Sequence, residues 1–305
     1  MSAPDSTIKV SVIMPTFNRA KYIIESIACI QNQTYPNWEL LIIDDGSEDN
    51  TEELVNQLKD GRIQYYKEIK TGIGGCIKNS GLKKASGNFI AFIDSDDVWA
   101  PSKLEKQVNA LLQYPETGFC LTGGYNFKIP FEPVEYFYPQ REGIKVENVF
   151  QSYFKSELPG FTQALMLRKE CIGVTGMFKE VNSFSDLYFI LTLAWHYKAV
   201  ILFEPLLYRR LHSNSYSTDS WEKSYKEGIA LIRYYNNKKM ISSKTTRNSL
   251  FRLYINFGED CLKHKENKKA VLQFINAWIY KPASIIPFKK MGKTLLRMLK
   301  KHPLD

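Results

Sequence analysis

Short apolar runs alternate with segments of helical periodicity along the first hundred residues, and this alternation limits the possible folds more than any other feature. Runs with the composition and length of buried strands cover residues 10–14, 38–43, 63–66 and 89–93. Helical spacing between and beside them covers residues 20–30, 51–58 and 75–85. Strands that alternate with helices in this way form βαβ units with right-handed crossovers. The sequence therefore predicts an α/β protein with a mainly parallel sheet flanked by helices.

Polar segments follow three of these strands directly, at residues 15–19, 44–47 and 94–97. Ligands of such sheets bind beyond the carboxyl ends of the strands, so we expect these segments to form the functional site. Two of the three are acidic, which disfavours a bare phosphate. A divalent cation between the carboxylates and a phosphate would reverse that preference.

Asp94 and Asp96 stand two positions apart just after a strand, where both carboxylates can turn to one side. Mg²⁺ and Mn²⁺ prefer oxygen ligands and keep positions for substrate phosphates. Helix capping is the alternative for this segment, because Asp97 lies shortly before Pro101 and Asp is common at helix starts. The position after a fourth strand, opposite a second pair of aspartates, favours the metal site.

Three blocks of this region together resemble the signature blocks of the family-2 glycosyltransferases. They are VSVIMPTFN at residues 10–18, LIIDDGS at residues 41–47 and GNFIAFIDSDD at residues 87–97. Their order and spacing match the family, and the resemblance covers about residues 9–220. It implies the Rossmann-like GT-A fold and an inverting, metal-dependent enzyme that uses a nucleotide-diphosphate sugar, with UDP favoured by family habit. The implied acceptor is a hydroxyl of a glycan, and the implied process is cell-surface polysaccharide synthesis.

The resemblance also implies roles for residues of the donor site. Asp45 is expected to accept a hydrogen bond from the base, and Phe17 to lie against the base or the ribose. Asp94 is expected to contact the ribose, and Asp96 to ligate the Mg²⁺ or Mn²⁺ that bridges the two phosphates. The expected donor-binding residues are Pro15, Thr16, Phe17, Asn18, Asp45, Lys78, Asp94, Ser95 and Arg210.

Lys78 belongs to a glycine-led helix start at residues 72–81 that matches the family. The family usually carries Arg-Asn where this chain has Lys78 and Asn79. A lysine can still bind a phosphate, but it lacks the planar guanidinium with which arginine donates two hydrogen bonds at once.

Asp186 is the residue that the resemblance implies as catalytic base. The family carries an acidic pair, usually Glu-Asp, at a helix start behind a Gly-x-Phe turn. Here the turn is at residues 176–178, Asp186 matches the second member of the pair, and Ser185 stands where Glu is usual. Inversion requires a carboxylate that deprotonates the acceptor hydroxyl as it attacks. The alternative is an aspartate that serves the helix macrodipole.

Residues 206–215 are similar to the closing Tyr-Arg-x-His motif of the family, with Arg210 and His212 in the matching positions. Arg210 is expected at the pyrophosphate, and His212 is expected as a second metal ligand. A structural histidine is the alternative for His212. Residues 125–162 lie where the family binds its acceptor, and their aromatic residues suit either sugar rings or an ordinary core. These residues include Tyr136, Phe137, Tyr138 and Phe161.

The charge of the chain is unevenly distributed. The formal net charge is +9, but residues 1–220 carry a net −4 and residues 221–305 a net +13. We therefore expect a catalytic domain at residues 1–220, with a nucleotide-sugar half (1–98) and an acceptor half (99–220). A basic helical region at residues 221–305 would follow it.

The end of this basic region has the pattern of an amphipathic helix. Residues 281–302 contain seven basic side chains and no acidic one. The apolar positions expected on one face are Phe288, Met291, Leu295, Met298 and Leu299. This profile is typical of a helix that lies on anionic lipid. A solvated helix packed on the catalytic domain is the alternative, and no DNA- or RNA-binding module accompanies the charge, so we expect no nucleic acid partner.

Cysteine spacing and hydropathy bear on location. The five cysteines form no CxxC or Cys/His pair, which favours a reducing compartment. No signal-like run opens the sequence, and no stretch approaches 18 uninterrupted apolar residues. We expect a cytoplasmic protein that associates peripherally with the inner face of the membrane and acts on a lipid-linked acceptor.

Two other functions compete with the transferase hypothesis. A nucleotidyltransferase also uses acidic strand ends, but it would show a glycine-rich basic loop after the first strand, where this chain has residues 15–18. A non-catalytic lipid- or nucleic-acid-binding protein on a degenerate transferase scaffold is the other alternative. The presence of Asp45, Asp94, Asp96 and Asp186 argues against it.

Overall fold

The structure of the chain is a computed structural model that describes residues 7–128, 132–137, 142–158, 160–181, 184–212 and 221–300. The chain forms two compact units. The first comprises Met1–Phe150 and Leu158–Ser215, and the second comprises Gln151–Glu157 and Tyr216–Asp305.

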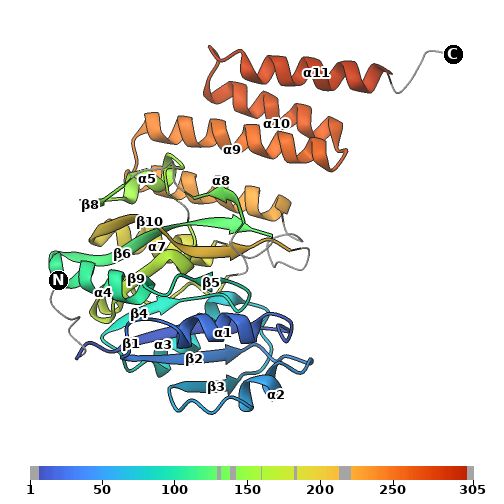
Figure 1. Ribbon diagram of the computed structural model, residues 1–305. Helices are drawn as coiled ribbons and strands as arrows, with labels where there is room; N and C mark the ends of the chain where they lie inside the picture. Colours follow the sequence, from blue (N-terminus) through green and yellow to red (C-terminus); the bar gives the residue numbers. More distant parts are fainter. Residues whose placement is uncertain are drawn as a thin grey trace. The chain divides into compact units, whose positions relative to one another are not determined.

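The N-terminal half of the first unit has the βαβ architecture that the sequence predicts (Figure 1). Its elements are β1 (Val10–Thr16), α1 (Ile23–Gln31), β2 (Trp38–Asp44), α2 (Thr51–Asn56), β3 (Ile63–Lys67), α3 (Gly74–Lys84) and β4 (Phe89–Phe92). The strands pair in parallel in the order β3-β2-β1-β4. Every residue of β2 is buried, as expected for a strand covered on both faces.

Both parallel and antiparallel pairings complete the sheet in the second half of the unit. Its elements are β5 (Val98–Trp99), α4 (Lys103–Gln113), β6 (Thr117–Phe127), β7 (Pro133–Tyr136), β8 (Ile144–Glu147), η1 (Thr162–Ala164), β9 (Leu165–Arg168), η2 (Lys169–Cys171), α6 (Ile172–Thr175), α7 (Ser185–His196) and β10 (Lys198–Arg210). All residues of α5 (Phe150–Phe154) except the first belong to the second unit. The strand order continues from β4 through β9, β6 and β10 to β5. The long strands β6 and β10 are parallel, whereas β9 is antiparallel to both β4 and β6.

The core explains why α1 forms where it does. Ile23, Ile27 and Ile30 recur at helical spacing and are fully buried against the sheet. The strands contribute alternate residues such as Val12 and Leu40 to the same apolar cluster. The α/β fold class, with helices on a mainly parallel central sheet, is thereby confirmed.

The register of the strands determines where the functional segments meet. Thr16 at the end of β1 lies opposite Asp44 at the end of β2. On the other side, Ile13 of β1 lies opposite Phe92, the last residue of β4. The three polar segments that follow these strands therefore lie at one edge of the sheet.

Four helices make up most of the second unit: α8 (Trp221–Asn237), α9 (Ser243–Lys263), α10 (Asn267–Tyr280) and α11 (Ile286–Lys300). They confirm the helical C-terminal region that the sequence predicts. Helix α10 lies between α9 and α11 (Figure 1). The Phe274 ring packs on Gly258, where an added Cβ would lie only 2.4 Å from the ring, so only a glycine permits this close approach of α9 and α10. Among the residues that the structure describes, no helix is long and apolar enough to cross a bilayer.

Candidate active site

Three aspartates form an acidic cluster directly after β4. The carboxylates of Asp94, Asp96 and Asp97 offer oxygen atoms within 4.8 Å of one another. Burial raises the pKa of Asp97 well above its ordinary value, and the charges of Asp94 and Asp96 add to this effect. Burial likewise raises the pKa of Asp94 against the opposing charge of Lys78. The cluster concentrates negative charge in a poorly solvated place, which a cation would relieve.

Asp97 does not cap a helix. The cap residue of α4 is Ser102, and β5 separates it from Asp97. Instead, Oδ1 of Asp97 accepts a hydrogen bond from the backbone N–H of Arg210 at 2.9 Å, which ties the end of β10 to the cluster. Within the described part of the chain, its buried Oδ2 has no hydrogen-bond partner. An unpartnered oxygen beside two other carboxylates fits the hard-oxygen donor set of Mg²⁺ or Mn²⁺.

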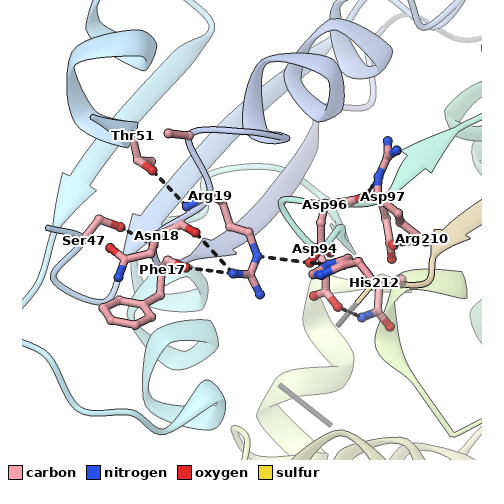
Figure 2. Close-up of polar contacts among 12 residues, drawn as sticks. Phe17, Asn18, Arg19, Ser47, Thr51, Asp94, Asp96, Asp97, Arg210 and His212 are labelled. Atoms are coloured by element: carbon pink, nitrogen blue, oxygen red, sulfur yellow. Dashed lines mark hydrogen bonds and ion pairs between the residues drawn. The ribbon is translucent and has the colours of Figure 1, made fainter. Parts of the chain in front are cut away.

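Two nitrogen groups converge on one oxygen of Asp96 (Figure 2). Arg19 Nε donates to Asp96 Oδ2 at 3.1 Å, and His212 Nε2 lies 2.9 Å from the same atom. His212 Nδ1 is buried and has no partner among the described residues. The structure thus brings His212 to the acidic cluster, and its role as a metal ligand stays a prediction. Arg19 belongs to the polar segment 15–19 that the sequence predicts at the functional site, but the sequence predicted no role for this residue by itself.

Arg210 is held by groups of the chain itself. Its Nε donates to the backbone oxygen of Asp96 at 2.9 Å, and its guanidinium forms an ion pair with Glu25 at 2.6 Å. The same guanidinium lies over the rings of Tyr22 and Phe127. Arg210 therefore lies beside the acidic cluster, and its contact with a pyrophosphate stays a prediction.

Lys78 and Asp186 form an ion pair beside this cluster. Lys78 Nζ lies 2.6 Å from Asp186 Oδ1, and it also donates to Thr162 Oγ1 at 3.0 Å. Thr162 Oγ1 in turn donates to Asp186 Oδ2 at 2.9 Å. The charges of both members of the pair affect the pKa of Asp94, which shows that the pair lies close to the cluster. Asp186 stands in the first turn of α7, so a favourable macrodipole interaction accompanies these contacts.

A close approach of two segments positions this pair. The first turn of α3 contacts the loop before α7: an added Cβ at Gly75 would lie 2.3 Å from the Lys179 carbonyl oxygen. Ser185, which replaces the usual Glu, donates its hydroxyl to the same carbonyl oxygen at 2.7 Å. Gly75 therefore permits the contact that places Lys78, one turn further along α3, beside Asp186.

Asp45 at the end of β2 lies in a second part of the site. Its Oδ1 accepts from the backbone N–H of Thr71 at 2.6 Å, and its Oδ2 accepts from that of Gly72 at 2.8 Å. Both carboxylate oxygens thus bind the loop that leads into α3. The contact of Asp45 with a nucleobase stays a prediction.

Residues 15–18 lie next to the end of β2. The Asn18 backbone N–H donates to Ser47 Oγ at 2.8 Å, in a left-handed conformation with φ of 51° (Figure 2). The half-buried Phe17 ring has the ammonium of Lys70 4.3 Å from its centre. Thr16 Oγ1 is buried, and in the part of the chain that the structure describes it has no hydrogen-bond partner. Pro15 is half-buried.

Residues from distant segments complete the site. Gln163 Nε2 donates to Asp94 Oδ2, and Ser95 is buried within the cluster segment. Gln163 lies 69 positions from Asp94, and no sequence signal pointed to it. In the predicted acceptor segment, the rings of Phe137 and Phe161 lie 4.9 Å apart, whereas Tyr138 lies outside the described residues.

The sequence model of "Glycosyl transferase family 2" matches residues 11–178. The glucosyltransferase WfgD of Escherichia coli, named as acting on GlcNAc-diphosphoundecaprenol, is 48% identical over 105 residues, which are 34% of this chain and 41% of WfgD. The chain thus matches well under two thirds of that relative. TuaG of Bacillus subtilis, a glycosyltransferase assigned to teichuronic acid biosynthesis, is 30% identical over 221 residues, which are 71% of this chain and 84% of TuaG.

Solved structures show the same fold. TarS of S. aureus in complex with UDP-GlcNAc has a TM-score of 0.61 at 17% identity, over 96% of this chain and 73% of that one. The mannosyltransferase PcManGT of Pyrobaculum calidifontis, in complex with GDP-Man and Mn²⁺, has a TM-score of 0.57 at 18% identity, over 97% and 82% of the two chains. At these identities the likeness concerns the fold.

Proposed function

Because this chain belongs to glycosyl transferase family 2, we propose that it is an inverting glycosyltransferase that moves a sugar from a nucleotide-diphosphate sugar to a hydroxyl of a glycan. The main support for this proposal is that two sets of charged side chains lie close together at one edge of the sheet. One is the acidic cluster of Asp94, Asp96 and Asp97, and the other is the ion pair of Lys78 and Asp186.

The donor would occupy the ends of β1, β2 and β4. In this proposal Asp45 recognises the base, Phe17 covers the base or the ribose, and Asp94 contacts the ribose. The remaining proposed donor-binding residues are Pro15, Thr16, Asn18, Lys78, Ser95 and Arg210. UDP is the proposed nucleotide, and the name of the relative WfgD, which uses UDP-Glc, supports this choice.

A divalent cation, Mg²⁺ or Mn²⁺, is the proposed cofactor. Asp96 and His212 would hold it, because His212 Nε2 contacts Asp96 Oδ2 and Asp96 belongs to the same acidic cluster as Asp97, whose Oδ2 has no hydrogen-bond partner among the described residues. When bound, such a cation stabilises the negative charge that develops on the departing diphosphate.

Asp186 is the proposed catalytic base. The acceptor oxygen forms a bond to the anomeric carbon of the donor while the bond from that carbon to the phosphate oxygen breaks. The acceptor proton passes to Asp186, and the nucleoside diphosphate leaves with the electron pair, so that the anomeric configuration is inverted. Lys78 and Thr162 orient the carboxylate through direct contacts with both of its oxygens.

The acceptor is proposed to be a lipid-linked glycan of cell-surface polysaccharide synthesis. The names of WfgD and TuaG, which refer to a diphosphoundecaprenol-linked sugar and to teichuronic acid, support this choice. We further propose a catalytic domain at residues 1–220, with halves at 1–98 and 99–220, and a helical region at 221–305. The corresponding proposal for location is peripheral attachment at the inner face of the membrane.

A thermal-shift screen of UDP-, GDP- and dTDP-sugars, with and without Mn²⁺ or Mg²⁺, tests this function, because a ligand that binds the native state raises its stability. We expect stabilisation by a UDP-sugar that depends on the cation, and cation-dependent release of UDP when a polyprenyl-diphosphate sugar is added. Stabilisation without turnover on any such acceptor would favour the non-catalytic scaffold. Release of pyrophosphate from a nucleoside triphosphate would favour the nucleotidyltransferase.

A further inference from the structure

Helices α10 and α11 leave large apolar side chains exposed. On α10, Leu272, Ile275 and Ile279 recur at i, i+3 and i+7, and each is at least 40% exposed. They lie on the face opposite Phe274 and Ala277, which are fully buried. Three exposed apolar residues in register on one helix form a stripe rather than scattered positions.

Helix α11 continues this apolar surface. Phe288, Leu295 and Leu296 are exposed, with Phe288 and Leu295 two turns apart on the same face. The ring of Phe288 lies 5.4 Å from that of Trp278 on α10, so the exposed residues of the two helices are in contact. The less exposed positions of α11 include the buried Pro287 and Thr294 and the half-buried Met291 and Met298. Met291 thus belongs to the packed side of α11, whereas the sequence pattern placed it on the same face as Phe288.

Every charged side chain that α10, α11 and the loop between them contribute is basic. Residues 267–300 contain eight basic residues and no acidic one. Two of these lysines form ion pairs within the same unit. Lys269 pairs with Glu222 and Glu266, and Lys290 pairs with Glu259. The exposed Lys268, Lys289 and Lys293 have no acidic partner among the described residues. They remain available to an external anion.

We propose that α10 and α11 together form a docking surface for an anionic lipid bilayer. Exposed apolar side chains flanked by lysines match the boundary between acyl chains and anionic headgroups in both polarity and charge. A second copy of this chain on the same surface would bring the exposed lysines of both copies close together, and their like charges would repel. Charge complementarity therefore favours anionic lipid over self-association. A nucleic acid would satisfy the lysines but would leave the apolar residues without a partner.

Co-sedimentation of the full chain with vesicles tests this surface without any nucleotide sugar, so its outcome is separate from that of the proposed activity. We expect binding to vesicles of phosphatidylglycerol and phosphatidylcholine that is at least tenfold tighter than to phosphatidylcholine alone and that weakens at high salt. Absence of binding, or equal binding to both vesicles, would overturn the proposal.

Matched double variants separate the two contributions. Ile279→Ser with Leu296→Ser removes side chains that are 61% and 60% exposed, and Val134→Ser with Val174→Ser removes two that are each 57% exposed elsewhere. Lys289→Glu with Lys293→Glu reverses two charges on the surface, and Lys238→Glu with Lys244→Glu reverses two exposed charges that lie outside α10 and α11. We expect the Ile279→Ser/Leu296→Ser variant and the Lys289→Glu/Lys293→Glu variant to bind vesicles at least tenfold more weakly, with an unchanged circular dichroism spectrum. The two control variants should bind like the unsubstituted chain. Equal loss in the control variants contradicts the proposal, as does a dimer in solution that only the surface variants dissociate.

Discussion

Lys78 Nζ lies 2.6 Å from Asp186 Oδ1, and this pair joins the second turn of α3 to the first turn of α7, 108 positions apart in the sequence. The lysine that the family resemblance places at the donor phosphates therefore also contacts the proposed base directly. Its two possible roles, binding a phosphate and orienting a carboxylate, predict different kinetic defects.

Replacement of Lys78 separates these roles. Because Lys78 is proposed both to bind the donor and to orient Asp186, Lys78→Met is expected to lower kcat by roughly tenfold or more and also to raise the donor KM, since alignment of the reacting groups and a donor contact are both lost. Steady-state kinetics with varied donor concentration measure both constants. A raised donor KM with unchanged kcat would assign Lys78 to the phosphates alone. Lys78→Arg, which keeps the charge, serves as the conservative comparison.

Asp186→Asn is expected to bind the donor normally and to reduce transfer by roughly 10²- to 10⁴-fold, because the amide cannot accept the acceptor proton. Donor affinity from the thermal shift and product formation from chromatography are measured on the same preparation. Glu180→Gln is the matched control, since Glu180 is an exposed carboxylate in the loop before α7 that accepts from Asn79. If Asp186→Asn transfers as fast as Glu180→Gln, another group is the base.

Asp96→Asn is expected to abolish the part of nucleotide binding that depends on Mn²⁺. The substitution removes a charged oxygen that Arg19 and His212 both contact, and with it the proposed cation ligand. Isothermal titration with UDP, with and without Mn²⁺, reports this effect independently of turnover. Asp60→Asn, which breaks a surface ion pair with Arg62, is the control and should leave the Mn²⁺ effect intact. An undiminished Mn²⁺ effect in Asp96→Asn would refute the assignment.

Glu39 gives a prediction about stability and pH. Burial alone would raise its pKa, but hydrogen bonds from Lys9, Ser11 and Ser86 outweigh burial and lower the pKa from 4.5 to about 2. The folded state thus binds fewer protons than the unfolded state between these values, so the contribution is complete above pH 4.5 and is lost as the pH falls towards 2.

Glu39→Gln is accordingly expected to lower the free energy of unfolding at pH 7 by about 1–3 kcal/mol, since several buried hydrogen bonds lose their charged acceptor. Urea denaturation at a series of pH values measures the difference from the unsubstituted chain. The difference should shrink as the pH drops below 4.5. A difference that is constant with pH would show that the carboxylate charge is not the source of the stability. Glu52→Gln, at an exposed ion pair with Lys67, should change little.

Much of the fold could be predicted from the sequence, because a buried strand and an amphipathic helix each leave a hydrophobic pattern within a short stretch of residues. A strand buried on both faces needs a continuous apolar run, so β1 and β2 are visible in the sequence, and α1 is visible in its isoleucine spacing. The meeting of Asp45 with Asp94 and Asp96 at one edge follows from parallel pairing alone. The short strand β9 has only four residues, too few to give a periodic signal, and its antiparallel insertion between β4 and β6 was not predicted.

Contacts between distant segments are the part that sequence patterns leave open. Gln163 reaches Asp94 from a 3₁₀ turn, and Thr162 of the same turn reaches Asp186, yet neither residue type is distinctive there. Arg19 carried a signal, its place after the first block, but nothing local indicates that its side chain crosses to Asp96. Such contacts depend on how separate loops pack, which a single sequence does not encode in any short pattern.

The two hydrogen bonds that Asp45 accepts from Thr71 and Gly72 have a consequence for attempts to change the nucleotide preference of the proposed transferase. If Asp45 recognises the base as proposed, the same carboxylate also anchors the loop from which α3, and with it Lys78, begins. A substitution made there to change nucleotide preference would release that loop and disturb the helix that carries Lys78. On the proposed roles, selectivity for the nucleotide and catalytic competence would be linked through one side chain, and a successful exchange of donor would need compensating changes at residues 71–72.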